Sequence, residues 1–147
     1  LLENFKNRAG FHILLKPHPG DNPEFYRKIL QKTDCKNAHI IFDNVLEIIS
    51  VSDLVVTMFS SIIVDALCLK KIVLEINYPT IDSPIQFDKM GATIQSNLED
   101  ITINVDKIFD NPQIQKSLIE NSEKIVNEIY NIPETESLRI LKESINF

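Results

Sequence analysis

Short apolar runs alternate with helix-forming stretches along the first half of the chain, and this alternation constrains the fold most. The runs cover residues 11–16, 39–42, 53–57 and 71–76. Each is too short for a buried helix and is bounded by prolines or polar turn residues, so each predicts a strand. The stretches between them carry apolar side chains at helical spacing. Strands and helices that alternate in this way predict a doubly wound, parallel α/β domain with helices on both faces of the sheet.

Several of the expected helices begin at recognisable signals. Pro23 can take the first helical position, and Asn44 with Glu47 three residues later forms a capping-box pattern. Asn97 is expected to cap a later helix, and Pro112 to open a long one. The elements expected besides the four strands are helices at 23–32, after 44, at 61–69, after 97, at 111–130 and at 134–145, and a short edge strand at 92–94.

Length and composition indicate one globular domain. The chain has 147 residues, of which 44% are hydrophobic, enough for a single core. We expect residues 1–10 to be a lead-in from a missing N-terminal half, so that the sequence is a piece of a longer protein. Residues 11–147 then form the α/β domain, including its C-terminal helices.

Charge and residue spacing exclude several classes of function. The formal net charge is −6 and the basic residues are scattered, so nucleic acid is not an expected partner. Cys35 and Cys68 form no CxxC motif and the histidines no HxxxH pair, so neither a metal site nor a disulfide framework is expected. No apolar run approaches the roughly 18 residues of a membrane span. We expect a cytoplasmic protein, which can still lie peripherally at the inner face of a membrane.

The residues that follow the strands are the place to look for a site. In open parallel sheets, ligands bind beyond the carboxyl ends of the strands, where helices begin and present free backbone N–H groups. The expected junctions are residues 16–20, 42–44, 57–61 and 75–79. The first and the third carry unusual chemistry.

The first junction is the sequence Lys16-Pro17-His18-Pro19. Prolines on both sides hold the backbone extended, so the imidazole of His18 should project from a stiff segment. A histidine in such a place can donate a hydrogen bond to phosphate, or a proton to a leaving group. The competing interpretation is that His18 only closes the end of the strand.

The third junction places Ser60 and Ser61 where a strand turns into a helix. Two hydroxyl groups, free amides and the helix dipole would converge there on an anion. Asp65 follows one turn later among apolar neighbours, where its carboxylate could accept the hydroxyls of a ribose. The competing interpretation is a plain serine cap with Asp65 facing solvent.

Two motifs together resemble one enzyme family. The segment TMFSSIIVDALCLKKIVLEI, residues 57–76, and the segment KPHP, residues 16–19, are similar in order and separation to motifs of the CDP-glycerol glycerophosphotransferases. Residues 136–140 resemble the opening of that family's last helix. A more distant similarity is to the UDP-N-acetylglucosamine 2-epimerases, which have two glycines where this chain has Ser60 and Ser61. Met58 departs from the family pattern, in which an acid is usual.

The resemblance implies the Rossmann-like C-terminal half of a GT-B fold. It implies that His18, Ser60 and Ser61 hold the diphosphate of a CDP-, CMP- or UDP-linked donor, with added charge from Lys16. Asp65 would bind the ribose, and the loop containing Asp43 and Asn44 the base. It implies no cofactor and no metal, since helix dipoles and basic side chains can stabilise the leaving nucleotide.

The function implied is synthesis of a cell-envelope polymer such as teichoic acid or a capsular polysaccharide. The missing N-terminal half would supply the acceptor site, so the isolated domain should bind nucleotide and not turn over. Two alternatives stay open. One is another nucleotide-sugar enzyme, such as a sialyltransferase or an epimerase, and the other is a noncatalytic α/β anion-binding module.

Overall fold

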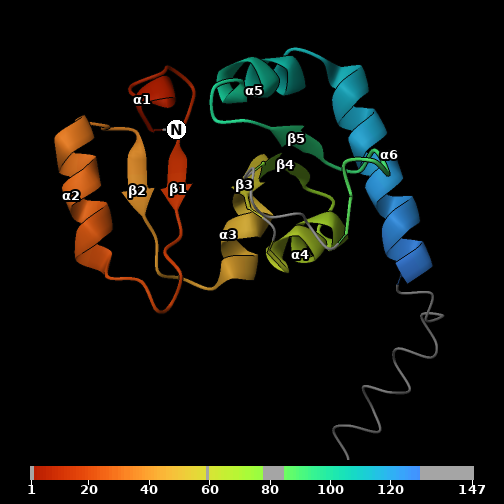
Figure 1. Ribbon diagram of the computed structural model, residues 1–147, viewed down its shortest axis with the longest axis horizontal. Coiled ribbons are helices and arrows are strands. Elements are labelled where there is room, and N and C mark those ends of the chain that lie inside the picture. Colours follow the sequence, from red (N-terminus) through yellow and green to blue (C-terminus); the bar gives the residue numbers. More distant parts are fainter. Residues whose placement is uncertain (1, 59, 78–84, 130–147) are drawn as a thin grey trace, which may run out of the picture.

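The computed structural model describes residues 2–58, 60–77 and 85–129, and within these the chain is an α/β protein with parallel strands (Figure 1). Strands β1 (Ile13–Leu15) and β2 (Ala38–Ile40) form one small sheet. Strands β3 (Leu54–Thr57), β4 (Ile72–Ile76) and β5 (Ile94–Ser96) form a second, in that order. The expected parallel α/β class is confirmed, although the described strands form two hydrogen-bonded sheets where the sequence predicts one.

The helices are placed by local signals at their starts. Helix α2 (Pro23–Thr33) begins with Pro23 and is capped by Asn22, whose side chain accepts the Glu24 N–H. Helix α3 (Val45–Val51) is capped in the same way by Asn44. The remaining helices are α1 (Leu2–Phe5), α4 (Ile62–Cys68), α5 (Ile101–Phe109) and α6 (Pro112–Ile129).

The core lies on both faces of the sheet that contains the fully buried strand β4. On one face, β4 packs against α1, α5 and the first half of α6. On the other face it packs against α3, α4 and the second half of α6. Alternate residues of β4 supply the two faces, as the period of a strand requires. The buried residues of the two clusters are Phe5, Ile72, Leu74, Ile76, Ile101, Val105, Ile108 and Leu118, and Ile49, Ile63, Ala66, Leu67, Val73, Phe87, Ala92 and Ile125.

Side-chain packing connects the two sheets. Ile13 of β1 and Leu54 of β3 both pack against the cluster that surrounds Phe5. The N-terminal segment also binds the β1–β2 sheet, since Asn37 donates from Nδ2 to the backbone oxygens of Phe5 and Phe11, each at 3.0 Å. The segment expected to be a lead-in therefore contains a short helix that belongs to the hydrophobic core.

Two boundaries in the second half were wrong in the sequence-based expectation. Strand β5 covers 94–96 instead of 92–94, because the Ala92 N–H donates to the oxygen of Phe87 in a turn and pairing with β4 starts at Ile94. Helix α5 begins at Ile101 and its N-cap is Asp100, three residues beyond the expected cap at Asn97. The start of α6 is confirmed. The expected terminal helix at 134–145 lies outside the described residues.

None of the helices in the described ranges combines the length and the apolar character needed to cross a bilayer.

Candidate functional site

The expected site residues follow the strands on the carboxyl side. Lys16 comes directly after β1, Asp43 and Asn44 come after β2, and Ser60 and Ser61 come after β3. Because the strands within each sheet are parallel, the loops of one sheet open at the same edge. At the level of the fold, these residues therefore lie where a ligand site is expected in an α/β domain.

The loop after β1 is held by hydrogen bonds as well as by its prolines. The backbone N–H of His18 donates to Oδ2 of Asp21 at 3.0 Å, and Tyr26 of α2 donates its hydroxyl to the same oxygen at 2.5 Å. The N–H of Gly20 donates to Nδ1 of His18 at 3.2 Å. His18 itself is exposed. The segment that the prolines were expected to stiffen is thus also held by hydrogen bonds, which the sequence pattern did not indicate.

Lys16 joins the loops after β1 and β2. Its Nζ donates to the backbone oxygen of Phe42 at 3.5 Å, which places the ammonium group beside Asp43 in the chain. Asn44 has a structural task, since its Oδ1 accepts the N–H of Leu46 at 2.8 Å and caps α3. Its side-chain amide nitrogen makes no hydrogen bond to any residue whose position is described. Glu47 does not complete the expected capping box with a bond to Asn44.

The helix start after β3 differs from the expectation in detail. Ser60 uses its hydroxyl locally, because Oγ accepts the Ile62 N–H at 3.3 Å. Ser61 is exposed and makes no side-chain capping bond. Helix α4 has seven residues, so its dipole is weaker than the expected nine-residue helix would supply. Asp65 is half-buried, and its carboxylate has no hydrogen bond or ion pair to any residue that the structure describes.

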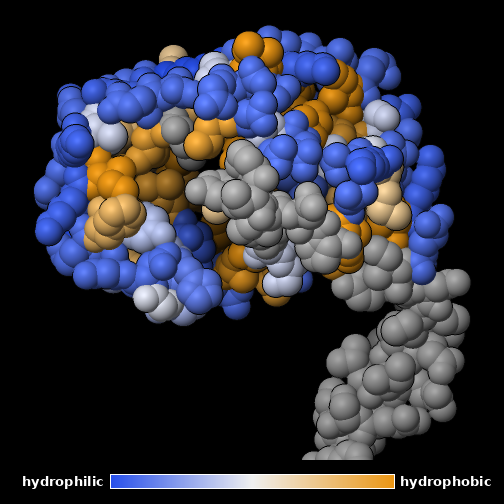
Figure 2. Space-filling model, viewed as in Figure 1, coloured by the Kyte–Doolittle hydropathy of each residue, from blue (hydrophilic) through white to orange (hydrophobic). Residues whose placement is uncertain are grey.

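The His18 loop and the Ser60–Ser61 turn are not joined by a polar contact between described residues. Within the described part of the chain, no hydrogen bond or ion pair joins residues 16–22 to residues 57–65. Figure 2 shows a hollow with a hydrophobic floor beside the β1–β2 sheet. A separate depression lies between the end of α4 and α6, lined by Leu67 and Val126 among others, at the opposite end of α4 from Ser60 and Ser61.

Glu75 is the ionisable residue that the sequence reasoning passed over. It lies near the end of β4, only 3% exposed, and accepts a hydrogen bond from the Thr93 hydroxyl. Burial raises the pKa of its carboxyl group, the Thr93 bond lowers it, and the charge of Asp88 raises it further, with a net increase. Its register partner on β3 is Thr57, which directly precedes the serine-containing turn. A single acid within an otherwise apolar strand was the signal that could have drawn attention to it.

The cysteines do not form a disulfide. Cys35 is buried and Cys68 exposed, and burial followed by the charge of Asp65 raises the pKa of the Cys68 thiol, which keeps it protonated. Among the residues with described positions, no three histidine, cysteine or acidic side chains gather as a metal site would need.

When the chain is compared with models of known protein families and with curated proteins, neither comparison gives a match.

Proposed function

We propose that this chain is the donor-binding domain of a GT-B-type transferase that makes a cell-envelope polymer, with CDP-glycerol or a related nucleotide-linked compound as donor. The fold would be one half of two, and the catalytic cleft would form against the other half. The protein would then work in the cytoplasm, close to an acceptor at the membrane surface.

The observation that carries this proposal is the position of the polar loops. Two parallel strands of one sheet and the first strand of the other are each followed by residues able to bind part of a nucleotide, namely Lys16 and His18, then Asp43 and Asn44, then Ser60 and Ser61. This is the arrangement by which open α/β sheets bind nucleotides. Of these residues, Lys16, His18, Ser60 and Ser61 lie in the two motifs that resemble the glycerophosphotransferases.

In this proposal each loop has a distinct task. Lys16 and His18 face the diphosphate with one charge and one hydrogen-bond donor, and Ser61 contributes its hydroxyl to the same anion. Asp65, whose carboxylate has no described partner, accepts the ribose hydroxyls. Charge stabilisation of the departing diphosphate by such groups is the contribution that this half would make to catalysis.

A thermal-shift panel tests the proposal. The protein is heated with CDP-glycerol, CMP-sialic acid, UDP-N-acetylglucosamine, free nucleotides and inorganic pyrophosphate. A ligand at ten times its Kd should stabilise the fold by about 1.4 kcal/mol. A shift with one nucleotide-linked compound that exceeds the shift with pyrophosphate supports a donor site. A shift with simple anions alone supports the noncatalytic anion-binding module.

Two variants separate the proposed roles. Ser61→Ala should weaken nucleotide and pyrophosphate alike, by about tenfold, because a hydrogen bond to an anion is lost. Asp65→Ala should weaken nucleotide binding and leave pyrophosphate binding unchanged. Ser117→Ala, an exposed serine on α6, is the matched control. If both site variants bind every ligand as the parent does, the assignment fails, and transfer catalysed by these 147 residues alone would refute the need for a second half.

A further inference from the structure

The loop that carries His18 is anchored to helix α2 through one carboxylate. Oδ2 of Asp21 accepts both the His18 backbone N–H, at 3.0 Å, and the Tyr26 hydroxyl, at 2.5 Å. The Asp21 N–H donates back to the oxygen of His18 at 2.9 Å. Tyr26 lies in the first turns of α2 and is half-buried, so its hydroxyl has a defined position. The loop is therefore tied to a helix instead of hanging freely from the end of β1.

The protonation states of the two side chains favour this arrangement at neutral pH. The Tyr26 hydroxyl, and next the His18 N–H, lower the pKa of the Asp21 carboxyl, so Asp21 is ionised and accepts both bonds. The same bond raises the pKa of Tyr26, so its phenol keeps the proton that it donates.

A third hydrogen bond determines which nitrogen of His18 carries the proton. The Gly20 N–H donates to Nδ1 at 3.2 Å. A ring nitrogen that accepts a hydrogen bond carries no proton, so the proton of the neutral ring is on Nε2. Because the ring is exposed, this Nε2–H group is available to a ligand.

We propose that Asp21 and Tyr26 are positioning residues that hold the His18 loop so that the Gly20 amide keeps the imidazole as an Nε2–H donor to an anionic oxygen. The identification of that oxygen as part of a diphosphate rests on the proposed function. The tautomer of His18 and its dependence on Asp21 and Tyr26 do not rest on the proposed function.

This tautomer limits the reactions in which His18 can take part. A neutral ring with its single proton on Nε2 can stabilise a negative oxygen by hydrogen bonding, but it is a poor proton donor because loss of that proton would leave an imidazolate anion. His18 would therefore bind the diphosphate as it gains charge, and would not act as the general acid that the sequence alone left open. The proton needed by an acceptor reaction would be handled by other groups.

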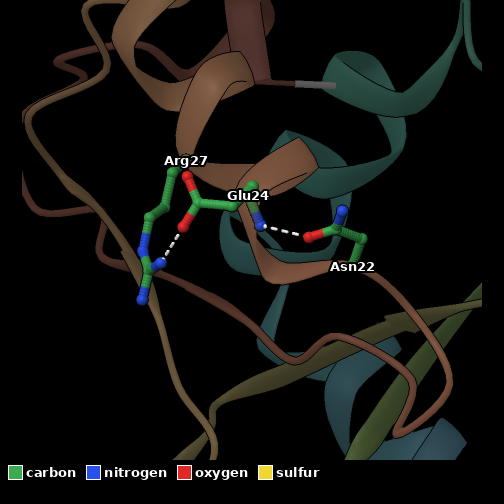
Figure 3. Close-up of polar contacts among 3 residues, drawn as sticks. All are labelled: Asn22, Glu24 and Arg27. Atoms are coloured by element: carbon green, nitrogen blue, oxygen red, sulfur yellow. Dashed lines mark hydrogen bonds and ion pairs between the residues drawn. The ribbon is translucent and has the colours of Figure 1, made fainter.

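A neighbouring acid supplies a matched control. Glu24, three residues after Asp21, is exposed, and Figure 3 shows its backbone N–H bound to the Asn22 cap and its carboxylate paired with Arg27. Both acids lie at the start of α2 and both carry one negative charge, but Glu24 makes no bond to the His18 loop. Glu24→Ala and Asp21→Ala therefore change net charge equally and differ in the contact under test.

The experiment measures the Gly20–His18 hydrogen bond directly in the isotope-labelled protein at pH 8. Nitrogen–nitrogen coupling between the Gly20 amide and Nδ1 of His18 should be present in the parent and in Glu24→Ala. It should be lost in Asp21→Ala, reduced in Tyr26→Phe, and restored in Asp21→Asn, which keeps an oxygen acceptor. No coupling in the parent, or equal coupling in Asp21→Ala, would overturn the proposal.

Binding of inorganic pyrophosphate, measured by calorimetry, gives the functional readout. Asp21→Ala should weaken it about three- to tenfold relative to Glu24→Ala, although both remove a negative charge that would repel the anion. Equal affinity in the two variants would refute a role of this contact in ligand binding. A parent protein that shows the coupling but binds no pyrophosphate would refute the proposed donor site and leave the positioning of His18 intact.

Discussion

Replacing Glu75 by glutamine should stabilise the protein at neutral pH, which is unusual for a substitution in a central strand. Glu75 is 3% exposed in β4, between neighbouring strands on both sides. Its charged form is disfavoured because burial, opposed by the Thr93 hydrogen bond and assisted by the charge of Asp88, raises the pKa of the carboxyl group. Glutamine retains the oxygen that accepts the Thr93 hydroxyl and removes the charge.

The magnitude follows from the cost of a buried polar group that is only partly compensated, about 1–3 kcal/mol. Burial of the amide NH2 group that glutamine introduces offsets a part of this gain in stability. We therefore expect the free energy of unfolding at pH 7 to rise by about 1–2 kcal/mol and Tm to rise by roughly 3–6 °C.

The pH dependence has a definite sign. A raised folded-state pKa means that the folded protein holds this proton more tightly than the unfolded chain does. The stability that Glu75 contributes is complete below the ordinary pKa of 4.5 and is lost as pH rises through the folded-state pKa. Glu75→Gln should therefore match the parent at pH 4 and exceed it at pH 7.

Urea unfolding at pH 4 and pH 7 measures both quantities, with Glu47→Gln, an exposed glutamate of α3, as the control that should change little at either pH. A Glu75→Gln variant less stable than the parent at pH 7, or one whose advantage is equal at both pH values, would show that the carboxylate is well compensated in the fold.

Asn37→Ala should lower the free energy of unfolding by about 2–3 kcal/mol, since two backbone oxygens lose their shared donor; an unchanged urea midpoint would contradict this. Ile108→Ala should cost about 2–5 kcal/mol, because the side chain is fully buried, and a smaller loss would mean that the cavity collapses. Gly91→Ala should lower Tm more than Gly10→Ala, although both glycines have positive φ. A Cβ at Gly91 would meet Nδ2 of Asn121 at 2.9 Å, whereas one at Gly10 would meet nothing within 4 Å. Equal losses of Tm would indicate that Asn121 moves aside.

Much of the α/β pattern could be predicted from local sequence. The apolar runs of β1 to β4 were found to within two residues at each end, and Pro23, Asn44 and Asn111 marked helix starts that the structure confirms. These features depend on residues close together in the chain, through the periodicity of burial and the capping of free amides.

The tertiary structure determined features of the protein that local sequence signals do not encode. Phe5 is buried because α5 and β4, far along the chain, provide its surroundings, so a four-residue helix forms where a polar lead-in was expected. Glu75 is one acid in an apolar strand, and its burial in the folded protein makes its charge unfavourable. Burial and hydrogen bonding depend on the distances that folding sets between residues. Spacing in the sequence indicates only which residues are neighbours on the same strand or helix.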